Sequence, residues 1–452
     1  MKLARLVLLS GLAACVVGPE TPEPELDLPA DFTRALDLPQ AERLWWEGFS
    51  DPTLDRLVAR SLDRNLSVRA ADARLARAEA LARAERSDLF PRIDGAVTAA
   101  GAAGDEPGYE GALVGAWTPD LFGDRRRELR AARADLLGAE ASVENARRIT
   151  ASALAATYVE LRRVDAQIAL LRQSLDLQRQ TLRIVRLRAE AGLAADLDVQ
   201  RAAGDLARTR AQSGPFDEAR ARAAYAINVL VGRAPTDALF DDAAQAEIPH
   251  YAAGPQAGVP ADLIRRRPDI RAAEARLVAA AQRVGAERAD LYPSFDLSGV
   301  ITTDLAAGDI VSGAVKRITA TLDVPLLDGG RRLAEVRAAR AAAEEALADY
   351  ELAILTALEE TEGALIAIEA AEQRRADLEA AVDASEIAFD QLQALYKEGL
   401  ATLIDVLDAQ RQLIGSREAF TNSDAAVARA YVELYTALGA PTRVEAAAPG
   451  GS

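Results

Sequence analysis

The sequence predicts a mainly α-helical fold with about four membrane β-strands per chain, internally duplicated and closed into a barrel by further copies of the chain. Three observations lead to this fold class. The fragments ERSDLFPRID (85–94) and ERADLYPSFD (287–296) nearly repeat each other. Two long stretches, 124–191 and 330–398, contain no proline and almost no glycine, which is typical of very long helices. Before each stretch, alternating apolar and polar residues predict a β-hairpin.

The composition excludes several kinds of chemistry. The 452 residues include one His (His250), one Cys (Cys15) and one Met, so a single chain cannot assemble a His/Cys metal cluster, a disulfide or a Cys/His nucleophile pair. We therefore expect neither a metal nor a cofactor. The net charge of −17 argues against nucleic acid as a partner, because such binding relies on basic residues that outweigh nearby acids. Acids such as Asp405 and Asp408 have no nucleophile or phosphate-binding loop beside them, so we expect no enzyme activity.

The N-terminus, MKLARLVLLSGLAAC, is typical of an export signal, since a basic start precedes an apolar run. Its LAAC end resembles the bacterial lipobox, which implies that signal peptide 1–14 is removed and that Cys15 carries a covalent lipid. Val16, where an Asp favours inner-membrane retention, implies sorting to the outer membrane. The alternative is an incidental Cys in an ordinary signal peptide. The proline-rich start of 15–50 predicts an extended, acylated tether rather than a domain.

The body of the chain is an internal duplication whose parts occur twice in the same order. VRAADARL at 68–75 aligns with IRAAEARL at 270–277, and AGLAADLDV at 191–199 aligns with EGLATLIDV at 398–406. The duplication predicts two similar structural units and a flexible C-terminal tail. The first repeat, the second repeat and the tail are expected at 51–250, 251–440 and 441–452.

Each repeat is expected to contain a helix, a hairpin, a long helix and a return helix. The first helix stops before a proline, Pro91 or Pro293, which marks a structural corner before the first strand. A glycine, Gly192 or Gly399, suits the left-handed position that ends the long helix. The expected bounds are hairpin 92–120, long helix 124–191 and return helix 194–231, then helix 268–291, hairpin 294–326, long helix 330–398 and return helix 402–438.

The hairpins are the candidate membrane-spanning elements. Beyond the signal, no apolar run approaches the roughly 18 to 20 residues that a spanning helix needs. Apolar residues alternate with polar ones in the second hairpin, at Ile318, Ala320, Leu322 and Val324. This alternation alone does not exclude the alternative that the two hairpins lie on the surface of a soluble protein. Membrane strands would require oligomerisation, because about four strands cannot close a barrel, whereas a ring of three chains gives about twelve.

Three segments carry a resemblance to a known family. They are RLWWEGFSDPTLDRLVARSLDRNLSVRAADARL (43–75), PADLIRRRPDIRAAEARLVAA (260–280) and LIDVLDAQRQL (403–413). In this order they resemble the outer-membrane factor family, which is TolC-like, and most closely the OprM/NodT-type lipoproteins of RND efflux systems. The resemblance covers essentially the whole mature chain.

The resemblance implies a homotrimeric channel, lipid-anchored in the outer membrane, with a β-barrel in that membrane and an α-barrel extending into the periplasm. It further implies a passive exit duct for small molecules, delivered by an inner-membrane RND pump through a periplasmic membrane-fusion adaptor. Two alternatives stay open. A type I secretion exit duct shares the fold, and a lipid-tethered periplasmic coiled-coil scaffold would not need amphipathic hairpins.

The turns after the two long helices resemble the adaptor-docking tips of the family. This resemblance implies that Gly192, Leu193, Gly399 and Leu400 are contact residues. Simple helix termination explains the two glycines equally well. It does not explain an exposed leucine after each of them.

A candidate periplasmic gate follows the second tip. Ile404, Asp408 and Arg411 share one helix face because of their i, i+4, i+7 spacing. By resemblance this face lines the closed aperture, where three Asp408 carboxylates beside Arg411 would form an ion-pair ring that adaptor contact breaks. The alternative is an ordinary surface pair worth a few tenths of a kcal/mol. The corresponding residues of the first repeat, Arg201 and Gly204, do not repeat the pair, which favours the gate.

Overall fold

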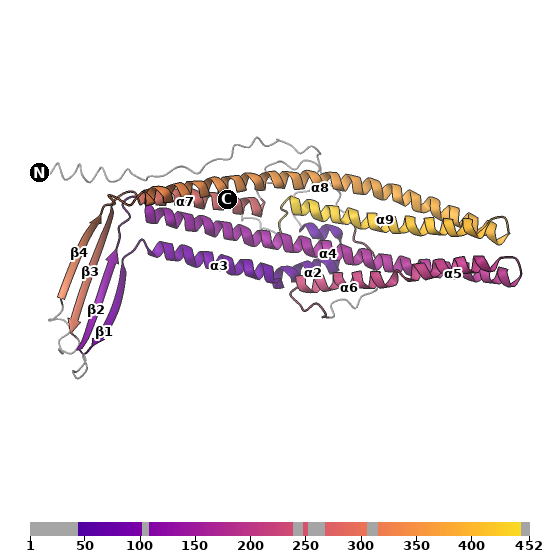
Figure 1. Ribbon diagram of the computed structural model, residues 1–452, viewed down its shortest axis with the longest axis horizontal. Helices are drawn as coiled ribbons and strands as arrows, with labels where there is room; N and C mark the ends of the chain where they lie inside the picture. The colour runs from indigo at the N-terminus through magenta and orange to yellow at the C-terminus, as the bar shows by residue number, and fades with distance from the viewer. Residues whose placement is uncertain (1–43, 102–107, 238–246, 252–266, 305–314, 444–452) are drawn as a thin grey trace, which may run out of the picture. The chain divides into compact units, whose positions relative to one another are not determined.

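The computed structural model describes residues 44–101, 108–237, 247–251, 267–304 and 315–443. The predicted signal peptide 1–14, the lipidation site Cys15 and parts of the predicted tether and tail lie outside these residues. The elements run in the order η1 (Trp45–Phe49), α2 (Pro52–Arg64), α3 (Leu66–Ser87), β1 (Arg92–Ala100), β2 (Gly108–Trp117), α4 (Asp124–Glu190), α5 (Asp196–Arg210), α6 (Ser213–Leu230), α7 (Pro268–Ala289), β3 (Ser294–Asp304), β4 (Val315–Asp323), α8 (Arg331–Lys397) and α9 (Leu403–Ala437). The predicted fold class, long helices with four strands, is confirmed (Figure 1).

The chain divides into two compact units, and each draws on both repeats. The first unit contains Ala71–Val143 and Pro268–Ile354, including the whole β-sheet. Of the described residues, the second contains those of 28–70, 144–267 and 355–452, including both predicted tips and the predicted gate. The two repeats therefore fold together rather than as separate domains.

The four strands form one antiparallel sheet in the order β1-β2-β3-β4, so the hairpins of the two repeats pair through β2 and β3 (Figure 1). The register places Ile93 opposite Gly115, Gly115 opposite Gly299, and Gly299 opposite Ile318. Residues paired in this way point to the same face, because side chains alternate along a strand. The register therefore assigns every strand residue to one of two faces.

One face of the sheet is apolar and the other carries the charges. The apolar face holds Ile93, Val97, Tyr109, Leu113, Trp117, Phe295, Leu297, Ile301, Ile318 and Leu322, with Lys316 as its one charged strand residue. The opposite face holds Arg92, Asp94, Glu110, Asp296, Arg317 and Asp323. Ile93 and Ile318 are 74% and 82% exposed. Because water disfavours a contiguous apolar surface of this extent, the face is suited to contact lipid.

The helices α4 and α8 each contain 67 residues. At about 1.5 Å per residue each is about 100 Å long. The apolar and small residues that recur at 3,4 spacing along α8 are buried, at Tyr350, Ile354, Ala357, Thr361, Ala364, Ile368, Phe389 and Tyr396. In the described part of the chain, no helix is both long and apolar enough to cross a bilayer.

The return helix of the first repeat differs from the expected single helix at 194–231. It is divided into α5 and α6 at Ala211 and Gln212. Pro215 explains the break, because proline lacks an N–H and its ring clashes with the carbonyl four residues earlier, here that of Ala211. In the structure Pro215 lies in the first turn of α6, where proline is tolerated. The return helix of the second repeat has no proline, and α9 is continuous.

The short helix η1 is anchored on α9 by aromatic packing. Trp45 and Trp46 are buried, and the Trp45 ring stacks on Tyr435 with centroids 5.9 Å apart. The ring of Phe49 meets Tyr251 edge-on at 5.1 Å. Aromatic side chains bury a large apolar area, so this cluster fixes the start of the described chain onto the last helix.

Replacing Gly232 by Ala should lower the stability strongly. Gly232 follows α6 with a φ of +71°, and an added Cβ would lie 2.5 Å from the carbonyl oxygen of Arg64. The left-handed strain of about 1–2 kcal/mol and the forced shift of the α2 backbone add up to about 3 kcal/mol. Gly329→Ala is the matched control, since Gly329 has a φ of +68° and open space around it. Denaturant unfolding followed by circular dichroism in detergent checks this, and equal losses in both variants would contradict the predicted clash.

Candidate functional site

The long helices α4 and α8 end in the same arrangement of hydrogen bonds. The N–H of Leu193 donates to the Arg188 carbonyl at 2.7 Å, and the N–H of Leu400 donates to the Leu395 carbonyl at 2.9 Å. Between these partners Gly192 and Gly399 adopt φ angles of +74° and +81°. This six-to-one bond around a left-handed glycine is the Schellman motif. Helix termination therefore fully accounts for the two glycines.

The leucines after these glycines have no such structural role. Leu193 is 68% exposed and Leu400 is 75% exposed, and neither belongs to the buried cluster beneath the tips. Their backbone N–H groups complete the helix ends, which any residue other than proline can do. The side chains are therefore available for an apolar contact with a partner.

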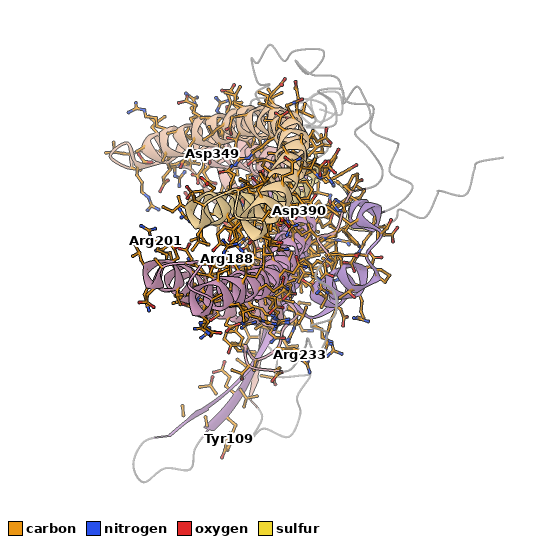
Figure 2. All side chains as sticks on the ribbon, turned by 90° about the vertical axis from the view of Figure 1, so that its right-hand side faces the viewer. Tyr109, Arg188, Arg201, Arg233, Asp349 and Asp390 are labelled. Atoms are coloured by element: carbon orange, nitrogen blue, oxygen red, sulfur yellow. The ribbon has the colours of Figure 1, made fainter. Side chains whose placement is uncertain are left out.

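Arg188 joins the two tips to each other. Arg188 lies near the end of α4 (Figure 2). Its guanidinium donates to the Tyr396 carbonyl at 2.8 Å and lies 4.8 Å from the centre of the Tyr396 ring. The Tyr396 carbonyl lies at the C-terminal end of α8, where the helix dipole is negative and favours a nearby cation. The sequence did not reveal this contact, because an Arg near a helix end is normally assigned to the last carbonyls of its own helix.

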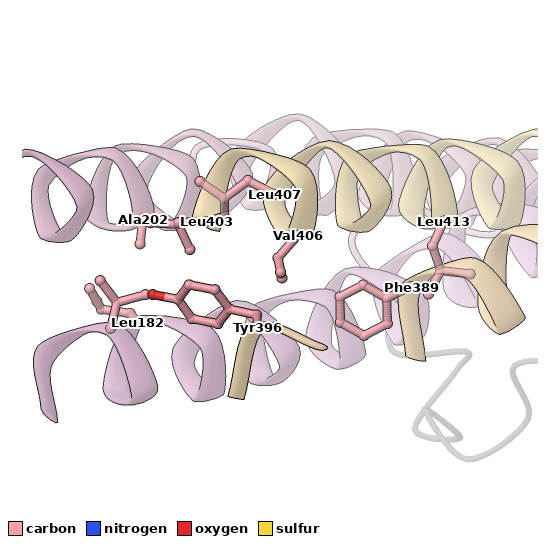
Figure 3. Packing of buried hydrophobic residues seen from close by; sticks show 9 residues of the cluster. Leu182, Ala202, Phe389, Tyr396, Leu403, Val406, Leu407 and Leu413 are labelled. Carbon is pink, nitrogen blue, oxygen red and sulfur yellow. The ribbon is translucent and has the colours of Figure 1, made fainter. Parts of the chain in front are cut away.

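A buried cluster beneath the tips packs the ends of four helices together (Figure 3). Its members come from α4, α5, α8 and α9, and they are Leu182, Val185, Ala202, Phe389, Tyr396, Leu403, Val406, Leu407 and Leu413. Leu403, Val406 and Leu407 alternate with the predicted gate residues along the first turns of α9. The cluster therefore fixes the orientation of the gate face relative to the tips.

The start of α9 is held by a capping box. The side chain of Thr402 accepts from the N–H of Asp405, and the Asp405 carboxylate accepts from the N–H of Thr402 at 3.0 Å. The hydrogen bonds from Thr402 lower the pKa of Asp405. The equivalent helix of the first repeat begins after Ala195, which offers no side-chain cap. The two tips thus share their turn geometry and differ in how the return helix begins.

The structure brings Asp408 and Arg411 together on an exposed face. A carboxylate oxygen of Asp408 lies 3.0 Å from Arg411, and their side chains are 60% and 54% exposed. Ile404 is also exposed, so the three predicted gate residues face solvent in the single chain. Arg411 makes a second ion pair, at 3.6 Å, with Asp205 of α5. Asp205 is nearly buried and was not predicted as part of the site.

The first repeat has its own ion pair on the corresponding helix. Arg201 belongs to α5 (Figure 2) and lies 3.5 Å from Asp198, one turn earlier on the same helix. Asp205 pairs with Arg208 at 2.8 Å as well as with Arg411. Arg411 therefore links the Asp408 pair of α9 to α5. Among the described residues, no ion pair links the Arg201–Asp198 pair of α5 to α9 in the same way.

The corners that precede the strands lie in the first unit. Pro91 and Pro293 immediately precede β1 and β3, and Phe122 stacks on Tyr292 with ring centroids 5.0 Å apart. A cavity of about 260 Å³ beside them is lined by several acids, among them Asp124. Burial, and next the charge of Asp290, raise the pKa of Asp124 to about 6. No group of three His, Cys, Asp or Glu side chains within the described ranges is arranged to hold a metal ion.

The contribution of Asp124 to stability should fall as the pH rises from about 4 to about 6. The unfolded carboxyl of Asp124 ionises near its ordinary pKa of 3.8, while the folded one keeps its proton until about 6. Above that pH the folded state carries the whole penalty, on the order of 1 kcal/mol once solvent screening is included. Asp124→Asn should remove the penalty, so it should raise the melting temperature clearly at about pH 7.5 and much less at about pH 4.

The control for this pH dependence is Asp390→Asn, because Asp390 is an exposed residue of α8. This control should keep the wild-type difference between the melting temperatures at about pH 4 and about pH 7.5. If Asp124→Asn also keeps the wild-type difference, the assignment of the proton to Asp124 is contradicted.

Comparison with known proteins gives concordant results over nearly the whole chain. Residues 57–233 and 259–440 both match the family model described as outer membrane efflux protein, with one match in each repeat. The chain is 32% identical to nodulation protein T of Rhizobium leguminosarum bv. viciae, covering 97% of this chain and 93% of that protein. It is 30% identical to outer membrane protein OprJ of Pseudomonas aeruginosa, covering 96% and 94%.

A solved structure has the same fold. The outer-membrane channel OprN superimposes with a TM-score of 0.83 at 31% sequence identity, and the match covers 94% of this chain and 99% of that one. The similarity thus extends over nearly the whole fold.

Proposed function

Since the chain belongs to the outer membrane efflux protein family, we propose that it is the passive exit duct of a tripartite, RND-type efflux system. The observation that carries this proposal is the division of the sheet into one apolar and one charged face. Strands with this division can contact lipid on one side and water on the other. The exposed leucines at the tips offer a separate, apolar surface to a second protein.

The duct requires several copies of the chain, and we propose three. In the described chain, β1 and β4 each pair with one neighbour only, so the sheet has two open edges. Open strand edges cannot be left in lipid, whereas three chains together supply about twelve strands. A homotrimer would therefore close the sheet without any further protein.

Helix α8 supports the same assembly. Six large apolar side chains of α8 are exposed and fall within about 100° of the helix circumference. This face differs from the one that carries the buried residues at 3,4 spacing. The six exposed residues are Leu333, Leu352, Leu355, Ile366, Ile387 and Leu395. A stripe of this length is suited to pack against a helix of a second copy.

The proposed partners at the tips are a periplasmic adaptor and, through it, an inner-membrane pump. A passive duct needs an energised transporter to deliver its cargo, and a bridge across the periplasm to reach that transporter. Leu193 and Leu400 are the proposed contacts, and the Asp408–Arg411 pair is the proposed gate. The exit duct of a type I secretion system would use the same geometry.

We also propose that Cys15 is acylated and anchors the chain in the outer membrane. The lipobox-like LAAC at the end of an apolar signal supports this, as does Val16 after it. Globomycin, which inhibits the lipoprotein signal peptidase, should cause the precursor to accumulate, and so should Cys15→Ser. Unchanged processing in both cases would contradict lipidation.

Ion conduction tests the proposed duct directly. The purified full chain, added to a planar lipid bilayer, should produce discrete current steps of uniform size. A lipid-tethered coiled-coil scaffold would produce no steps, and that result would overturn the proposal.

A further inference from the structure

A shallow groove lies between α3 and α4 in the first unit, next to the sheet. It has a volume of about 310 Å³. Its lining combines an apolar floor with a basic rim, and the residues are Glu79, Ala82, Arg83, Arg86, Leu129, Arg133 and Leu136. Ala82 and Leu129 are buried, while the three arginines are exposed. The groove therefore offers an apolar surface bordered by several guanidinium groups.

Two of these arginines are available to an anion. Arg83 lies 3.6 Å from Glu79 on its own helix. Within the part of the chain that the structure describes, the guanidinium groups of Arg86 and Arg133 have no ion pair and no hydrogen bond. A guanidinium binds phosphate well, because its fixed N–H groups donate two parallel hydrogen bonds. The groove is thus complementary in charge to a phosphate group.

The groove lies close to the end of the strands. Arg86 precedes the last residue of α3 and is six residues before β1, and Leu129 lies in the second turn of α4, which follows β2. Exposed aromatic and leucine side chains surround the same junctions, at Phe90, Trp117, Leu121, Leu291, Tyr292, Leu326 and Leu327. Aromatic side chains gather where a membrane meets water. A sheet inserted in the bilayer would therefore place this groove at the level of lipid headgroups.

We propose that this groove binds an anionic phospholipid of the leaflet nearest the helices. Arg86 and Arg133 donate to the phosphate, and an acyl chain lies along Ala82, Leu129 and Leu136. Basic pockets at this depth are a general means of lipid headgroup recognition. The inference rests on the proposed insertion of the sheet into the membrane, and it adds a specific lipid contact to that function.

The test uses a groove variant that carries both Arg86→Gln and Arg133→Gln, and compares it with a matched control. Arg74→Gln combined with Arg77→Gln removes the same charge from exposed positions of α3 outside the groove. Phosphatidylglycerol or phosphatidylcholine is titrated into the full-length protein in detergent, and bound lipid is counted by native mass spectrometry. The groove variant should bind phosphatidylglycerol about 10- to 30-fold more weakly than wild type, since each basic group near a lipid surface contributes about 1 kcal/mol. The control should match wild type.

Three results would overturn the inference. The first is equal retention of phosphatidylglycerol by the groove variant and its control. The second is displacement of the lipid by excess inorganic phosphate, which would indicate a site for free phosphate. The third is a groove variant that binds lipid as wild type does but loses the mass of the assembly, which would identify the groove as a contact between copies. Insertion of the wild-type protein into phosphatidylcholine vesicles is measured in parallel. Failure to insert would contradict the proposed duct, whereas the three results above contradict only the lipid site.

Discussion

Replacing Leu193 and Leu400 together by Asp should abolish efflux and leave the folded assembly intact. Both side chains are largely exposed at the tips and do not contribute to the buried cluster, so folding does not depend on them. Docking an adaptor over them would bury each side chain, which is worth about 1.5–3 kcal/mol per leucine. Carboxylates at the same positions would have to be desolvated without a partner, which adds a further cost.

The measurement is the release of a preloaded fluorescent tracer that the wild-type strain exports. We expect release to slow by at least about 10-fold, since 1.4 kcal/mol corresponds to a factor of ten in binding. Val229→Asp is the control, because Val229 is similarly exposed, at 56%, on α6 rather than at a tip. It should release the tracer at the wild-type rate. Normal release by the double tip variant, present at wild-type level in the outer membrane, would contradict the proposed docking surface.

Replacing Asp408 by Ala should raise the conductance of single channels in planar bilayers by at least about twofold. The Asp408–Arg411 pair lies on an exposed face of α9, and Arg411 also reaches Asp205 of α5. In a ring of three chains this face would hold three such pairs around the aperture. Removing the carboxylates of Asp408 would leave Arg411 paired with Asp205 alone and would loosen the constriction.

The control for the gate uses the ion pair of the first repeat. Asp198→Ala removes a similarly spaced i,i+3 partner, that of Arg201, from the corresponding helix. It should leave the conductance unchanged. Equal conductance in Asp408→Ala and wild type would identify the second-repeat pair as an ordinary surface interaction worth a few tenths of a kcal/mol.

The long elements were predictable because proline and glycine mark their ends in the sequence. Pro91 and Pro293 precede the first strands, and Gly192 and Gly399 follow the last residues of the long helices. The break between α5 and α6 was predictable from the same kind of signal. The duplicated pattern suggested one continuous return helix, and the local effect of Pro215 prevailed over that analogy.

The candidate site could be predicted only in part. The turn glycines, the leucines and the i, i+3 spacing of Asp408 and Arg411 are local features, so the sequence places them correctly on turns and on a helix face. Arg188 and Asp205 contact residues that are more than 200 positions away in the chain. Such contacts depend on how the two repeats pack together, and no local spacing specifies that arrangement.

Several copies of this chain should together close one channel in the outer membrane. The most direct test is the detergent-corrected mass of the protein extracted from isolated outer membranes, measured by light scattering on a size-exclusion column. We expect a mass of three chains, released from the membrane only by detergent. A single chain released without detergent would contradict it, because four strands with two open edges cannot form a pore in lipid.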